Sequence, residues 1–213
     1  MTTPRIEINL KKIAHNARVL RDLFAGKGIG IMGVTNAICG DPVIADILVT
    51  NGINTLSDSR LSNIIRMRQA GVQAQFVLLR TPSLSQAQSV VNNADISINT
   101  ELVVLEKLSK CALRYNKPHK VIIMVEMGDL RDGIMPALLD ETIERINGLE
   151  GITLVGLGAN LACFGGIKPD QAKIDLEIPK AAKGKELHLI LEVWDKSDIV
   201  PLVDYRRVVM MVN

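Results

Sequence analysis

The chain has 213 residues, 47% of them hydrophobic, and this length and composition fit one globular domain, or one domain with a small appendage. The 25 basic and 23 acidic side chains nearly cancel, and only 3% of the residues are aromatic. The chain therefore offers neither a basic surface nor stacking groups, which excludes nucleic acid as an expected partner.

The first residues carry charges where a secretory signal would be apolar. Arg5 and Glu7 interrupt that stretch, and no run of roughly 18 apolar residues follows anywhere in the chain. We therefore expect a cytoplasmic protein with no membrane partner. The alternating residues Arg5–Asn9 predict a short strand, and the amphipathic segment Leu10–Ala25 predicts a helix.

Short runs rich in Val and Ile then alternate with longer segments of helical period, which is typical of βα units around a parallel sheet. The predicted strands are Ile29–Thr35, Asn54–Ser57, Gln75–Arg80, Ala94–Ile98, Lys120–Glu126 and Thr153–Gly158. The predicted helices between them are Pro42–Asn51, Leu61–Ala70, Ser83–Asn92, Glu101–Tyr115 and Leu139–Asn147. Six strand–helix units fit either a barrel or a doubly wound sheet, and the period alone does not choose between them.

Glycines cluster at the start of the first of these strands. Gly28, Gly30 and Gly33 spell G-x-G-x-x-G, the motif of a dinucleotide-binding loop. That loop follows a strand and opens a helix, whereas these glycines precede a strand. We therefore prefer the interpretation that they lead into and line a tight strand.

The character of the chain changes after Pro169. Residues 171–186 are polar and lysine-rich without a clear period, as linkers often are. Strand-like segments follow, at Leu187–Val193, Ile199–Asp204 and Arg206–Val212. We expect antiparallel strands here that pair with Arg5–Asn9 and cover one open edge of an incomplete barrel.

The cysteines and histidines are scattered and show no ligand spacing. They are Cys39, Cys111 and Cys163, and His15, His119 and His188. An odd number of widely spaced cysteines favours reduced thiols over a disulfide framework, and the spacing of the histidines predicts no metal site. We interpret the histidines as surface or structural residues.

A set of short motifs gives the chain a family resemblance. The segments are Pro4–Leu10, Met32–Pro42, Ser57–Arg60, Leu78–Pro82, Ala94–Glu101, Met127–Gly133 and Gly156–Gly166. In this order and spacing, they resemble the barrel-type pyridoxal-phosphate amino-acid racemases, and ornithine racemase most of all. The likeness covers roughly residues 4 to 169. It implies a (β/α)8 barrel of the triosephosphate isomerase type, here shortened to about six βα units with a short C-terminal β segment.

The resemblance also implies pyridoxal phosphate as cofactor, an amino acid as substrate, and a homodimer. The family lysine that holds the cofactor as an imine and moves a proton ends the first barrel strand, where this chain has Asn36. Asparagine has no amine and is not a base near neutral pH, so both roles fail together. Lys27 lies before the strand, and at about 3.3 Å per residue its amine belongs near the opposite end of the barrel. Asn36 could equally be a benign strand-end cap.

Four more residues are candidates for cofactor binding, with a plainer alternative for most of them. Arg131 matches the family arginine near the phenolic oxygen of the cofactor, although an arginine between two aspartates could form a surface ion pair. Asn160 occupies the place of a histidine that lies over the cofactor ring in alanine racemases. Arg80 and Asn99 fall at or after strand ends, where barrel function concentrates, yet each could simply cap a helix.

The resemblance implies an internal loss after Pro169, because the family continues with two more βα units and most of a C-terminal β domain. We expect a partial barrel over residues 1–170, a linker over 171–186 and a β-domain remnant over 187–213. The Gly/Ser-rich phosphate loop has no counterpart in the sequence. Three hypotheses stay open: an active racemase, a non-catalytic cofactor-binding or regulatory relative, and a decayed or incomplete gene product. The substitution at Asn36 favours a catalytically impaired chain.

Overall fold

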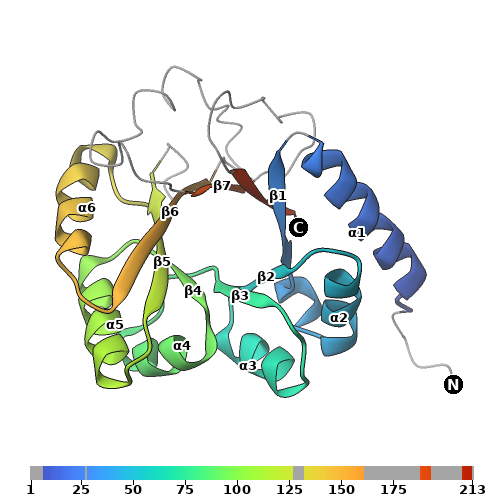
Figure 1. Cartoon of the computed structure of the whole chain (residues 1–213), viewed down its shortest axis with the longest axis horizontal. Coiled ribbons are helices and arrows are strands. Elements are labelled where there is room, and N and C mark those ends of the chain that lie inside the picture. Colours follow the sequence, from blue (N-terminus) through green and yellow to red (C-terminus); the bar gives the residue numbers. More distant parts are fainter. Residues whose placement is uncertain (1–6, 27, 127–131, 161–187, 193–207, 213) are drawn as a thin grey trace, which may run out of the picture.

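The fold is a closed barrel of parallel strands, arranged around the ring in the order of the sequence (Figure 1). The computed structural model describes residues 7–26, 28–126, 132–160, 188–192 and 208–212. The strands are β1 Ile29–Val34, β2 Thr55–Asp58, β3 Gln75–Leu78, β4 Ile96–Asn99, β5 His119–Val125, β6 Ile152–Asn160, β7 His188–Glu192 and β8 Val208–Val212. The expected barrel-type fold is therefore confirmed, and all six predicted βα strands are present.

Helices pack outside the strands, as Figure 1 shows. They are α1 Leu10–Ala25, α2 Pro42–Thr50, α3 Leu61–Gln69, α4 Ala87–Asn93, α5 Leu102–Arg114 and α6 Leu139–Asn147, with short 3-10 turns η1 Asn36–Ile38, η2 Leu84–Gln86 and η3 Pro136–Leu138. A side-chain cap begins α2, where the Asp41 carboxylate accepts from the backbone N–H groups of Val43 and Ile44. No helix in the described part of the chain is long and apolar enough to cross a membrane.

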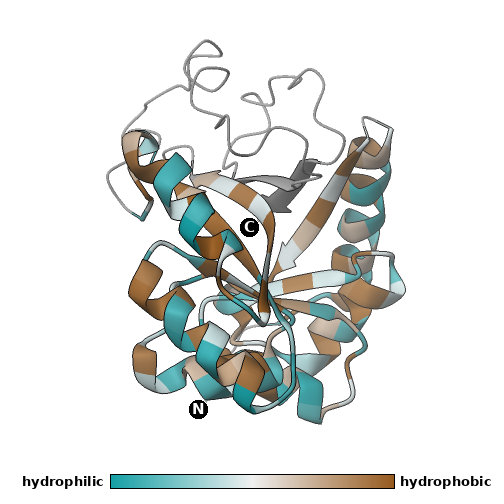
Figure 2. Cartoon of the chain, turned by 60° about the vertical axis from the view of Figure 1, so that its left-hand side comes forward, coloured by the Kyte–Doolittle hydropathy of each residue, from teal (hydrophilic) through white to brown (hydrophobic). Residues whose placement is uncertain are grey.

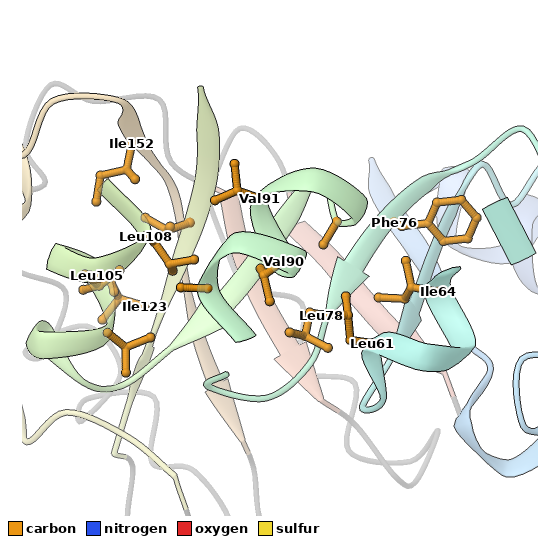
Figure 3. Close-up of a cluster of buried hydrophobic side chains, with 14 of the residues drawn as sticks. Leu61, Ile64, Phe76, Leu78, Val90, Val91, Leu105, Leu108, Ile123 and Ile152 are labelled. Carbon is orange, nitrogen blue, oxygen red and sulfur yellow. The ribbon is translucent and has the colours of Figure 1, made fainter. Parts of the chain in front are cut away.

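The hydrophobic core has two layers, because successive strand residues face opposite sides of the sheet. One layer lies between the sheet and the helices, where Phe76, Leu78 and Leu105 are buried together (Figure 3). The other fills the barrel interior and includes Met32 and Ile98. In Figure 2, coloured by hydropathy, the helices have a hydrophobic side and a hydrophilic side. Full burial of one such side chain contributes about 1.5–3 kcal/mol relative to leaving it exposed.

The C-terminal strands complete the barrel, contrary to our expectation. β7 is parallel to β6, and β8 is parallel to both β7 and β1, with Val208 opposite Ile29. The predicted antiparallel pairing with Arg5–Asn9 is therefore wrong, and residues 7–9 form no strand. Parallel β7 and β8 give β6 and β1 the neighbours that an incomplete barrel would lack.

The direction of these two strands depends on their connections. Residues 161–187 and 193–207 are each long enough for the crossover of a dozen or more residues that a parallel neighbour requires. The predicted linker and the predicted strand Ile199–Asp204 lie outside the described residues. The division of the chain into a barrel, a linker and a β-domain remnant stays a prediction.

The glycine motif belongs to a strand, as we expected. Gly28, at φ +71°, comes before β1, and Gly33 lies inside it. A Cβ atom at Gly33 would lie 3.1 Å from the Leu56 side chain and 3.2 Å from the Leu48 side chain. The glycine therefore allows close packing between β1 and the helix layer, and the chain after it enters η1 and not a long helix.

Candidate site at the carboxyl ends of the strands

Asn36 lies at the rim where the parallel strands end. It is exposed and begins η1, two residues after the last residue of β1. Thr35 is fully buried, and its hydroxyl donates to the carboxylate of Asp58 on the helix side of the sheet. Met32 and Val34 face the interior cluster, and the chain leaves the extended conformation at Thr35 (φ −108°, ψ 1°), so Asn36 lies at the carboxyl rim just past the strand. This is the end of the barrel at which barrel enzymes place their chemistry.

Asp58 fixes the backbone at this part of the rim. Its buried carboxylate accepts from the Thr35 hydroxyl at 2.8 Å, from the Arg60 backbone N–H at 2.8 Å and from Asn63 Nδ2 at 3.0 Å. These bonds join the end of β1, the end of β2 and the start of α3. The motif Ser57–Arg60 contains Asp58, but a strand that is buried on both faces does not reveal that this carboxylate faces the helices.

Two of the predicted site residues, Arg80 and Asn99, do not form one site with Asn36. Asn99 is fully buried, and its side-chain amide donates to the Ser97 carbonyl oxygen at 2.8 Å and to the Ser97 hydroxyl at 3.0 Å. Ile96 and Ile98 face the barrel interior, so Ser97 and Asn99 face the helices. Neither a cofactor contact in the barrel mouth nor the alternative role as a helix cap fits this orientation. Arg80 is exposed and lines a separate cleft.

The positions of the other two predicted residues are only partly described. Asn160 is the last residue of β6, where it stands in register with Glu192 of β7. Arg131 lies outside the described residues. The contacts that we predicted for both residues stay predictions.

His119 forms a buried polar pair with Ser97. The Ser97 hydroxyl lies 2.9 Å from His119 Nε2, and both side chains are almost fully buried on the helix side of the sheet. Burial lowers the pKa of His119 to about 4, with a further lowering by the nearby Lys117 charge and an opposing effect of Asp95. His119 is the first residue of β5, at the end of the barrel away from Asn36, and so has a structural position.

This histidine makes stability depend on pH. Its folded pKa is below the unfolded value of 6.5, so the unfolded chain binds the proton first as the pH falls. The stabilisation is complete above pH 6.5 and is lost between pH 6.5 and about 4, by on the order of 2–3 kcal/mol. Urea denaturation across this range would measure it. We expect His119→Gln to flatten the profile and His15→Gln, on exposed α1, to leave it unchanged; equal slopes in all three proteins would contradict the assignment.

Comparison with known proteins identifies the class. The model of the alanine racemase N-terminal domain matches residues 8–186, and the chain therefore belongs to this family. A second model, that of the C-terminal domain of cellulose-binding protein Sde0182, matches residues 163–212, which is less than half of the chain and overlaps the first match. The family resemblance that the motifs predicted is confirmed.

Among curated relatives, the chain is 35% identical over 188 residues to lysine racemase of Thermotoga maritima, covering 88% of this chain and 52% of that one. It is 37% identical over 167 residues to ornithine racemase of Acetoanaerobium sticklandii, covering 78% of this chain and 47% of that one. The chain thus spans about half the length of the curated relatives that it matches.

Solved structures support the fold alone, because their sequence identities are low. Alanine racemase of Clostridium difficile 630 matches with a TM-score of 0.74 and 18% identity, over 97% of this chain and 58% of that one. PipY of Synechococcus elongatus PCC7942, determined without PLP, matches with a TM-score of 0.75 and 16% identity, over 93% and 97% of the two chains.

The family to which the chain belongs uses pyridoxal phosphate, but the described residues do not fit a covalently held cofactor. Asn36 supplies no amine at the end of β1. The described lysines lie on the helices α1 and α5, in the loop before β5, and at the amino end of β5, where Lys120 is the second residue. No described lysine belongs to the last residues of a strand or to the described turns that directly follow the strands. Lys27 and the lysines of segments 161–187 and 193–207 lie outside the described residues.

Proposed function

We propose that this chain is a catalytically impaired member of the amino-acid racemase family, which does not hold pyridoxal phosphate as an imine. The observation that carries the proposal is the exposed amide of Asn36 at the carboxyl end of β1, in place of an amine. Asparagine neither condenses with the aldehyde of the cofactor nor exchanges a proton with a substrate carbon at neutral pH. The Asp58 network fixes the backbone beside Asn36, so a more distant amine would not take its place by a small shift.

The sequence after β7 supports the proposal. In barrels of this kind, phosphate is usually held by glycine-rich loops after the seventh and eighth strands. Residues 193–207, which connect β7 to β8, contain no glycine. Glycine is the residue type that usually lets backbone N–H groups come close to a phosphate, and this connection has none. Non-covalent retention of the cofactor in the mouth is weakened for this second reason.

A non-catalytic role that still binds pyridoxal phosphate or an amino acid is the alternative. No described contact favours it over impairment, and an amino-acid ligand, a homodimer and a cytoplasmic location stay predictions drawn from the family and the sequence. The question of a decayed gene product concerns selection and is separate from the chemistry tested below.

Borohydride trapping tests the proposal directly. The protein is incubated with excess pyridoxal phosphate, reduced, and mapped by peptide mass, which locates an adduct on any lysine, including those outside the described residues. We expect no site-specific pyridoxyl adduct in the unmodified chain. Asn36→Lys should become labelled at residue 36 more strongly than Asn16→Lys, a matched new lysine on exposed α1, becomes labelled at residue 16. A stoichiometric adduct on one native lysine would refute the proposal.

A further inference from the structure

A cleft of about 310 Å³ opens between the loops that follow β2 and β3, outside the barrel interior. The residues that line it include Arg60, Leu61, Ser62, Leu78, Arg80 and Pro82. Leu78 and Leu61 belong to the core layer between the sheet and the helices. The cleft therefore sits above that layer, and Asn36 is not among its lining residues.

Two guanidinium groups give the cleft one sign of charge. Arg60 and Arg80 are both exposed, and neither side chain forms a hydrogen bond or ion pair with another described residue. No Asp or Glu is among the lining residues. The nearest carboxylate by sequence, Asp58, is buried beneath and already accepts from three donors. The arginines are therefore available to a ligand and not neutralised by the protein.

Backbone donors at the start of α3 add to the two arginines. The first residue before the helix, Arg60, makes no side-chain cap, and its own N–H is used by Asp58. The Asn63 N–H donates to the Arg60 carbonyl, whereas the N–H groups of Leu61 and Ser62 meet no acceptor in the described part of the chain. Both residues line the cleft. Unpaired N–H groups at a helix start favour an anion.

We propose that this cleft binds a small phosphate-bearing molecule. Arginine forks and helix N–H groups together match the several oxygens of a phosphate, and charge-assisted bonds of this kind are the stronger hydrogen bonds in proteins. The volume is at the lower end of the range of small-molecule pockets, which excludes a large ligand. Leu78 and Pro82 supply apolar wall for an organic part. The proposal does not depend on whether Asn36 silences the barrel mouth.

A phosphorus NMR titration of inorganic phosphate into the full chain at low ionic strength tests the site. We expect saturable binding that Arg60→Gln and Arg80→Gln each weaken about tenfold. Arg60→Lys and Arg80→Lys, which keep the charge but lose the fork, should weaken it less. Arg114→Gln is the matched control, because Arg114 is exposed at the end of α5, near the opposite end of the barrel.

Each result bears on the proposal, provided that circular dichroism shows every variant folded. Binding that depends on Arg60 and Arg80 but not on Arg114 supports it. Absence of saturable binding would overturn it. Equal weakening in Arg114→Gln would also overturn it, because the arginines would then act only through net charge. Succinate serves as the second probe. Tighter binding of succinate than of phosphate would indicate that the cleft takes a dicarboxylate, and this result would also overturn the proposal.

Discussion

Purified chain supplied with pyridoxal phosphate is expected to leave D- and L-ornithine unchanged, and likewise lysine, alanine and arginine. The expectation follows from Asn36, because it stands where the family has the lysine that both holds the cofactor and moves the proton from the α-carbon. Loss of a residue that performs covalent catalysis commonly lowers the rate by a factor on the order of 10⁴ or more. Chiral chromatography after long incubation measures interconversion. Cofactor-dependent turnover of any of these amino acids would contradict the proposed impairment.

Asn36→Lys separates the missing amine from the rest of the site. We expect the variant to show weak imine absorbance with pyridoxal phosphate and no efficient racemisation, because one substitution restores the amine but not a phosphate clamp. A free aldehyde held only by a lysine forms an imine that hydrolyses readily. Asn36→Gln is the matched control, since it changes side-chain length without adding an amine. Turnover of about 1 s⁻¹ or faster in the lysine variant would show that the amine alone is missing.

The sequence predicted the βα elements well because their periods are local. Leu139–Asn147 and Leu10–Ala25 are helices with the predicted bounds, and β1 ends within one residue of its prediction. The same local signal identified strand-like segments near the C-terminus but carried no information on their direction. A long connection permits a parallel direction but does not require it, and the pairings from β6 through β7 and β8 to β1 show that both strands are parallel.

The candidate site was predictable only in part, because barrel strands are apolar on both faces and their sequence does not reveal which face is inside. Asn36 lies just past the end of β1, where the resemblance placed it. Asn99 is the last residue of β4, a strand that is buried on both faces, and its side chain faces the helices. Arg60 was missed because its neighbour in the cleft, Arg80, is brought to it only by the pairing of β2 with β3.

The segment that follows the Met127–Gly133 motif is hydrogen-bonded to the end of β5. Ile134 forms a parallel bridge with Val125, its N–H donates to the Met124 carbonyl at 2.8 Å, and its carbonyl accepts from the Glu126 N–H at 3.0 Å. Gly133 permits this close approach. A Cβ atom at residue 133 would lie 2.6 Å from Glu126 Cα and 2.8 Å from the Val125 carbonyl carbon, which are backbone atoms that cannot rotate away.

Gly133→Ala is therefore expected to destabilise the fold by about 3–5 kcal/mol, which combines the cost of overpacking against backbone with the loss of two hydrogen bonds. Gly148→Ala is the matched control, because residue 148 is in the right-handed helical region and its Cβ would come no closer than 3.5 Å to Arg145 O. That control should be neutral or slightly stabilising, since alanine restricts the unfolded chain. Urea denaturation at pH 7 compares the two variants with the unmodified chain. If both alanines changed the free energy of unfolding by the same small amount, the segment after residue 133 would not be held against β5 as tightly as its hydrogen bonds indicate.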